Sequence, residues 1–213
     1  MFVLTADQID SRNTFDRVGS MLALLDEQLG PRLALSPDRT AGDELQLLTR
    51  HADAALEALA ILARDGHWSV GMGVGSVDLP LPDAARAAHG DAFVAARSAV
   101  EYAKRSPTRF GLVGGAGLLR DAEVRAIIDL VLTVRARRST EGWAVVDLLE
   151  EGRTQASIAD ALGISPQAVS LRVSASGWRL DRSALPAILR LLEDLDGESG
   201  SGAEPVSAES PSI

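Results

Sequence analysis

Two aspartates stand where a strand end and a turn would bring carboxylates together. Asp7 follows the apolar run 2–6, and Asp43 lies in the polar turn before a second apolar run, 44–48. In a core of the order strand, helix, strand, strand, the first strand lies beside the hairpin formed by the next two, so the two carboxylates approach each other. Two carboxylates repel unless a cation lies between them, and hard oxygen ligands suit Mg²⁺. Asp7 and Asp43 are therefore predicted metal ligands, with capping and turn formation as their alternative roles.

Polar residues near these aspartates extend the predicted site. Asp10 and Glu44 are further acidic candidates. Ser11 and Arg12 stand at the predicted start of the first helix, where free backbone N–H groups favour phosphate. These residues predict a place where a divalent cation and a phosphate group bind together.

Hydrophobic periodicity predicts the elements that position these residues. Alternating and continuous apolar runs predict strands at 2–6, 32–35, 44–48, 68–74 and 110–113, and helical spacing predicts helices at 14–29, 52–64 and 91–104. Gly71 and Gly73 leave room for close backbone approach. This order predicts an α+β fold: a ferredoxin-like βαββαβ core with an extra unit, with its helices on one face of a mostly antiparallel sheet.

From residue 119 onward the pattern is wholly helical. Apolar spacing predicts helices at 119–138, 140–151, 154–162, 166–177 and 183–195. Between the third and fourth of these, Gly163 can take the positive φ that ends a helix, Ser165 can cap the next, and Pro166 suits its first turn. A short helix, a glycine turn and a second helix predict a helix-turn-helix, as in DNA-binding proteins. The alternative is an ordinary helical hairpin.

The second helix of this pair carries residue types that read DNA. The side chains predicted to face outward at its start and along it can contact bases or phosphates, as Gln does with adenine and Arg with guanine. Two residues near the start of the first helix are predicted phosphate contacts. The predicted DNA-binding residues are Arg153, Gln155, Ser165, Gln167, Ser170, Arg172 and Ser174.

Four segments together resemble known nucleotide-handling proteins. The segment 41–45, AGDEL, looks like the GGDEF turn of diguanylate cyclases, and 69–74 resembles the strand that follows it there. Residues 90–97, GDAFVAAR, are similar to the late helix of class III nucleotidyl cyclases. The opening 5–12, TADQIDSR, resembles most closely the SatD-type proteins of bacteria. The likeness covers about residues 1–113.

This resemblance implies a cyclase-like palm that binds a metal ion and nucleotide phosphates. It implies Asp7 and Asp43 as metal ligands and Arg97 as a phosphate-binding residue. The chain departs from the pattern at Phe93, where class III cyclases have an asparagine, and at Ala41, where the GGDEF turn has a glycine. The expectation is therefore a catalytically degenerate domain that senses a nucleotide, with Mg²⁺ as the cofactor. The alternative is an active Mg²⁺-dependent nucleotidyl cyclase or phosphotransferase regulated by its helix-turn-helix.

Composition and charge limit the classes of protein. The chain has 213 residues, 46% of them hydrophobic, no cysteine and a net charge of −9. No apolar run is long enough to span a bilayer, and without cysteine the chain is expected to be cytoplasmic. The acidic excess lies mostly after residue 193, whereas arginines and acids are equal in number between 119 and 182. The charge balance therefore permits DNA binding at a specific site and predicts modest, salt-sensitive affinity for random DNA.

The leading hypothesis is a bacterial transcriptional regulator in three parts. Residues 1–115 form the palm, 119–196 the helical DNA-binding domain, and 197–213 a disordered acidic tail. The predicted helix at 119–138 carries an apolar stripe long enough to link the domains and to pair with a second copy, as a palindromic operator demands of a homodimer. A third reading makes the helix-turn-helix a protein-interaction module only.

Overall fold

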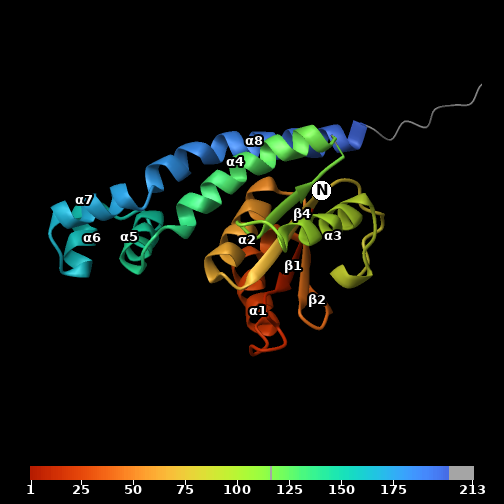
Figure 1. Cartoon of the computed structure of the whole chain (residues 1–213), viewed down its shortest axis with the longest axis horizontal. Coiled ribbons are helices and arrows are strands. Elements are labelled where there is room, and N and C mark those ends of the chain that lie inside the picture. The colour runs from red at the N-terminus through yellow and green to blue at the C-terminus, as the bar shows by residue number, and fades with distance from the viewer. Residues whose placement is uncertain (116, 202–213) are drawn as a thin grey trace, which may run out of the picture.

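The chain folds as an α+β protein with an extended helical arm. The computed structural model describes residues 1–115 and 117–201, with side chains described as far as residue 198 (Figure 1). A sheet and its covering helices form one end of the molecule, and three short helices form the other. The two longest helices run side by side between the two ends.

Five strands form a single sheet. They are β1 (Phe2–Gln8), β2 (Leu33–Ala41), β3 (Glu44–Thr49), β4 (Trp68–Val74) and β5 (Phe110–Val113). Their order is β2-β3-β1-β4-β5, with β1 antiparallel to β3 and β4, and β5 parallel to β4. The predicted central position of the first strand is confirmed, and the register places Asp7 opposite Glu44.

Helices cover both faces of this sheet, so the expectation that they lie on one face was wrong. Alternate residues of β1 and β4, such as Leu4 and Met72, pack in one core with α1 (Val18–Leu29) and α2 (Ala52–Asp65). The other face is covered by α3 (Asp91–Ala103). A Cβ at Gly73 would lie 2.1 Å from the carbonyl oxygen of Ala92, so the missing side chains let α3 pack directly on the strands.

Strand β2 and helix α1 differ in extent from their predictions. Strand β2 runs through most of the polar segment that was predicted as a turn, leaving only residues 42 and 43 to turn the chain. It is an edge strand with irregular register, and such strands accommodate a proline like Pro37. Helix α1 begins at Val18 rather than at 14, and Phe15, inside the predicted helix, lies before it and is 72% exposed beneath the guanidinium of Arg17.

The helical elements follow the predicted order. They are α4 (Leu118–Ala136), α5 (Thr140–Glu150), α6 (Gln155–Leu162), α7 (Pro166–Ala175) and α8 (Trp178–Ser201). Helix α8 starts earlier and ends later than predicted, so residues 197–201 of the predicted tail are helical. Residues 202–213, the rest of that tail, lie outside the described residues.

Two hydrophobic cores divide these helices. Ile128 of α4 and Leu192 of α8 belong to the same core as α1, α2 and the sheet. The second core lies among α5, α6 and α7. We call the sheet, the helices α1, α2 and α3 that cover it, and the parts of α4 and α8 that pack on it the sheet unit. We call residues 139–178 the helical unit. The predicted boundary near 115–119 separates segments of different secondary structure but does not separate these two cores.

The apolar stripe of α4 is largely used within the chain. Val124, Ile128 and Leu132 are buried in the core of the sheet unit, while Ile127 is 38% exposed. This stripe was predicted to pair with a second copy, and the packing of α8 and α2 against it leaves little of it for that role. Among the described residues, no helix is long and apolar enough to cross a membrane.

Candidate functional site

The loop after β1 is organised around the buried side chain of Gln8. Its amide donates to the carbonyl of Phe15 at 2.9 Å and accepts from the backbone of Arg17 at 2.9 Å. These bonds hold the chain in turns until α1 begins. Ser11 and Arg12 therefore lie in this loop and not at a helix N-terminus, which removes the predicted source of free N–H groups at that point.

An alternating row of charges lines the end of the sheet where the predicted metal ligands lie. Asp7 and Glu44 face each other across β1 and β3. Asp7 Oδ2 is 3.0 Å from Lys104 Nζ, and Glu44 is 3.5 Å from Arg97. Arg97, Glu101 and Lys104 recur at the spacing that places them on one side of α3. Opposite charges from strands and helix thus meet in pairs.

Lys104 is the residue of this row that was not predicted from the sequence. Its pKa is raised chiefly by the hydrogen bond to Glu101, against the effect of partial burial, with Asp7 adding to the rise. It is also the only lysine in the chain, and its spacing from Arg97 is one signal that could have identified it. The predicted phosphate-binding Arg97 is 72% exposed and lies in the same row.

Asp43 has a different partner from Asp7. Its carboxylate accepts a hydrogen bond from the hydroxyl of Ser11, and its carbonyl accepts from the backbone of Gln8 at 2.9 Å. The structure thus brings Asp7, Asp43 and Ser11 to one end of the sheet, as predicted. Arg12 is exposed there, and among the described residues no ion pair or hydrogen bond joins its side chain to either carboxylate.

The donor set at this end of the sheet fits a metal ion only in part. Carboxylate oxygens from Asp7 and Asp43 are ligands that Mg²⁺ prefers. However, Asp7 already has the Lys104 ammonium beside it, and no group of three acidic, histidine or cysteine residues suited to a metal occurs among the described residues. A cation at Asp7 would first have to displace that ammonium.

Side-chain caps and a glycine turn set the bounds of α6 and α7, the helix pair of the helical unit. The hydroxyl of Thr154 accepts from the backbone of Ser157 at 3.2 Å and starts α6. Gly163 ends it with φ 63, and the hydroxyl of Ser165 accepts from Ala168 at 3.2 Å to start α7. Ile158, Ala159, Val169 and Val173, with Val145 of α5, form the buried core beneath the pair. The predicted helices, turn and caps are confirmed.

The side of α7 away from this core is exposed and nearly free of charge. Most of the predicted DNA-reading residues lie on it with exposed side chains, namely Ser165, Gln167, Ser170 and Ser174. Leu171, which points outward with them, is 71% exposed. This surface presents hydrogen-bonding groups and one apolar side chain in the pattern i, i+3, i+4, i+7 from Gln167. Hydrogen-bonding and apolar groups of this kind match the edges of base pairs.

The three remaining predicted contacts flank this surface. Gln155 and Arg172 are partly buried, and the charge of Arg172 reaches Glu141 at the start of α5. Arg153 is exposed, and its guanidinium pairs with Glu151 at 2.9 Å. The two arginines of this unit are thus close to acids, which lowers their attraction for phosphate.

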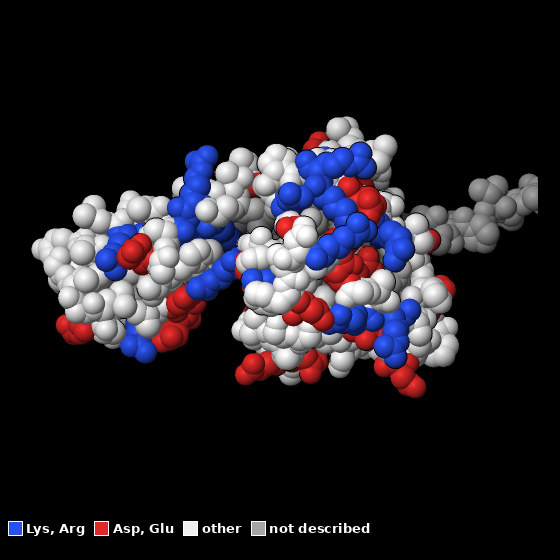
Figure 2. Space-filling view, turned by 60° about the horizontal axis from the view of Figure 1, so that its bottom comes forward, with Lys and Arg blue, Asp and Glu red and all other residues white. Residues whose placement is uncertain are grey.

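Charge is distributed unevenly over the molecule. Figure 2 shows acidic and basic side chains interspersed over the sheet unit, whereas the far end of the helical unit is largely uncharged.

Comparison of the chain with protein-family models, with curated proteins and with solved structures found no match.

Proposed function

We propose that this protein is a DNA-binding transcriptional regulator in which α6 and α7 form a helix-turn-helix. The observation that carries the proposal is the exposed face of α7, with Gln167, Ser170, Leu171 and Ser174 in line above a capped glycine turn. An α-helix fits the major groove of B-DNA, and these side chains match what the groove presents: Gln with adenine, Ser with several bases, Leu with the thymine methyl group.

Electrostatics favour recognition of a specific site over general affinity. The helical unit has more acids than bases, and Arg153 is already paired with Glu151. Few phosphate contacts mean a shallow dependence of affinity on salt and weak binding to random DNA. A homodimer on a palindromic site would double the contacts, and we propose that state for the DNA-bound form.

The test is selection of bound sequences from a random duplex pool, followed by mobility-shift titration on the enriched site. We expect a defined motif, and Gln167→Ala should weaken binding to it about 10- to 100-fold, as the loss of one bidentate base contact does. Arg172→Ala should weaken it measurably as well. Gln28→Ala, an exposed glutamine of α1, is the matched control and should leave affinity unchanged. If no motif is enriched, the helix pair serves another role, such as binding a protein.

For the sheet unit we propose a nucleotide-sensing function. The pairing of Asp7 with Lys104 and of Glu44 with Arg97 supports it, because these bases lie where a phosphate could exchange for a carboxylate. The strand order β2-β3-β1-β4 with α1 and α2 on one face is that of a ferredoxin-like core, which supports the likeness to cyclase-like palms and SatD-type proteins. Mg²⁺ at Asp7 and Asp43 belongs to this proposal.

The single lysine makes this second proposal testable. An amine-reactive reagent should label Lys104, and ATP with Mg²⁺ should protect it if phosphate replaces Asp7 as its partner. Asp7→Asn should change the labelling rate without abolishing labelling. Incubation with each nucleoside triphosphate and Mg²⁺ or Mn²⁺ then separates sensing from catalysis. Turnover that disappears in Asp7→Ala and Asp43→Ala would establish the alternative, an active nucleotidyl cyclase or phosphotransferase.

A further inference from the structure

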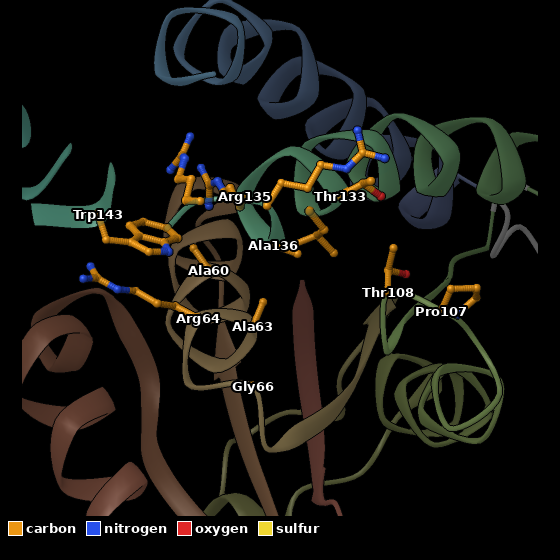
Figure 3. Close-up of a pocket in the computed structure, with 13 residues that line it drawn as sticks. Ala60, Ala63, Arg64, Gly66, Pro107, Thr108, Thr133, Arg135, Ala136 and Trp143 are labelled. Carbon is orange, nitrogen blue, oxygen red and sulfur yellow. The ribbon is translucent and has the colours of Figure 1, made fainter. Parts of the chain in front are cut away.

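A cavity of about 600 Å³ lies where the sheet unit meets the helical unit (Figure 3). The C-terminal ends of α2 and α4 form two of its walls, and the loop before β5, with Pro107 and Thr108, forms a third. Trp143 of α5 closes one side. This volume is in the range of small-molecule binding sites. None of the sheet-end residues discussed above lines the cavity.

The lining of this cavity is strongly basic. Arginine supplies its charged residues, Arg64, Arg135, Arg137 and Arg138, and no acid lines it among the described residues. Two carboxylates outside the lining neutralise part of this charge. Arg64 pairs with Asp147, while Arg135 and Arg138 share Asp181. Four guanidinium groups therefore meet two carboxylates, and Arg137 is exposed with no partner among the described residues.

Helix ends do not account for this excess of positive charge. The C-terminal ends of α2 and α4 both line the cavity, and each carries about half a negative charge. Together they offset roughly one of the two uncompensated positive charges. Thr108 donates its hydroxyl to the carboxylate of Asp129, and Thr133 donates its hydroxyl to the backbone carbonyl of Asp129, so neither can donate to a ligand at the same time. The guanidinium groups and the indole N–H of Trp143 are the donors that remain for an anion in this lining.

The rest of the lining suits the organic part of a ligand. Small and apolar side chains form a wall along α2 and α4, including Ala60, Ala63, Leu132 and Ala136. A phosphate group alone would leave most of the volume unfilled. Arginine binds phosphate with paired, parallel N–H donors, which makes a basic cavity with an apolar wall suited to a phosphorylated molecule.

We propose that this cavity binds a phosphorylated small molecule of nucleotide size, with Arg137 and Arg64 as its main phosphate donors. Arg64 also holds α5 through Asp147, so a ligand here acts directly on the contact between the two units. The inference does not depend on DNA binding or on nucleotide binding at the sheet end.

The experiment is isothermal titration calorimetry of the full chain with ATP, with pyrophosphate and with inorganic sulfate. We expect saturable binding of ATP or pyrophosphate that Arg137→Gln weakens about 10- to 100-fold, because a charge-assisted hydrogen bond contributes roughly 1.5–3 kcal/mol. Arg137 is exposed, and no described residue pairs with its side chain, so this variant should fold normally, as circular dichroism will check. Arg190→Gln is the matched control: it removes an exposed arginine of α8 outside the cavity and should leave the affinity unchanged.

A third variant separates this cavity from the sheet end. Arg97→Gln should leave the affinity unchanged if the cavity is the site. Loss of binding in Arg97→Gln with normal binding in Arg137→Gln would overturn the proposal and assign the ligand to the sheet end. Equal binding of sulfate, or equal weakening by Arg190→Gln, would show attraction by net charge only and would also overturn it. Absence of binding by every phosphate compound would do the same.

Discussion

Arg64, in the last turn of α2, donates two hydrogen bonds to the carboxylate of Asp147 on α5, at 2.7 and 2.8 Å. The same guanidinium lies 4.2 Å from the ring centroid of Trp143, which Arg138 approaches at 4.7 Å. One side chain of the sheet unit thus holds both a charged and an aromatic residue of the helical unit. Any motion between the units has to change this contact.

Arg64→Ala is expected to cost more free energy of unfolding than Asp147→Ala. The ion pair is half exposed, with side-chain exposures of 45% and 43%, so it contributes only about 0–1 kcal/mol. Arg64→Ala also removes the contact with Trp143, which contributes roughly 0.5–1 kcal/mol more. Urea denaturation of both single variants and the double variant will measure this. Equal costs for the two single variants would show that the stacking on Trp143 contributes nothing.

Asp181→Ala is expected to destabilise the fold by about 3–5 kcal/mol. Its carboxylate is buried and accepts from both Arg135 and Arg138, and removing it leaves two cations without a counter-charge. Thermal and urea unfolding will measure the effect. Asp160→Ala, an exposed aspartate of α6, is the control and should change stability by less than about 0.5 kcal/mol. Comparable losses of stability in both variants would contradict a structural role for the ion pairs of Asp181 with Arg135 and Arg138.

Asp181 also makes the stability of the fold depend on pH. Burial alone would raise the pKa of Asp181, but hydrogen bonds and charge from Arg135 and Arg138 outweigh it and hold the pKa below its ordinary value of 3.8. A pKa that is lower in the folded state gives stability that is complete above the ordinary value and is lost as pH falls through the folded-state value. In Asp181→Asn, the free energy of unfolding should therefore fall less steeply as the pH is lowered than it does in the wild-type protein. If the variant lost stability at low pH as steeply as the wild type, other carboxylates would be responsible for that loss.

Gly73→Ala is expected to disrupt the packing of α3 on the sheet. Its Cβ would lie 2.1 Å from the carbonyl oxygen of Ala92 and 2.3 Å from the backbone nitrogen of Ala96, and backbone atoms cannot move aside as a side chain can. We expect a loss of about 3 kcal/mol or more, beyond ordinary overpacking. Gly42→Ala, where a Cβ meets nothing within 4 Å, should cost less than about 1 kcal/mol. Similar unfolding midpoints for the two variants would refute this account of the glycine strand.

Replacing Gly163 or Gly19 with alanine should change the stability of the fold in opposite directions. Gly163 has φ 63 in the turn before α7, where any other side chain is strained by roughly 1–2 kcal/mol. Gly19 lies in the first turn of α1 with open space around it, so Gly19→Ala should stabilise by up to about 1 kcal/mol. Thermal unfolding of the pair gives the comparison. A gain in stability for Gly163→Ala would mean that the turn adopts another conformation.

Strand and helix positions in the sheet unit were largely predictable, but their arrangement was only partly so. The alternation of Trp68 to Val74 indicated a strand, and its glycines indicated close approach of another backbone. Which helix approaches, and from which face, depends on the crossover after β4 and was not predictable from spacing. The result is that α3 covers the face opposite α1 and α2, and its residues Arg97 and Lys104 come to lie beside Glu44 and Asp7.

The sequence alone determined those features that depend on neighbours along the chain. The turn at Gly163 and the cap at Ser165 form through hydrogen bonds over three or four residues, so their residue types predicted them directly. Tertiary structure decided the features that join distant residues: Lys104 beside Asp7, Arg64 on Asp147, and the apolar stripe of α4 buried under α8. A charged or apolar side chain has many possible partners in a sequence, and only packing selects one of them.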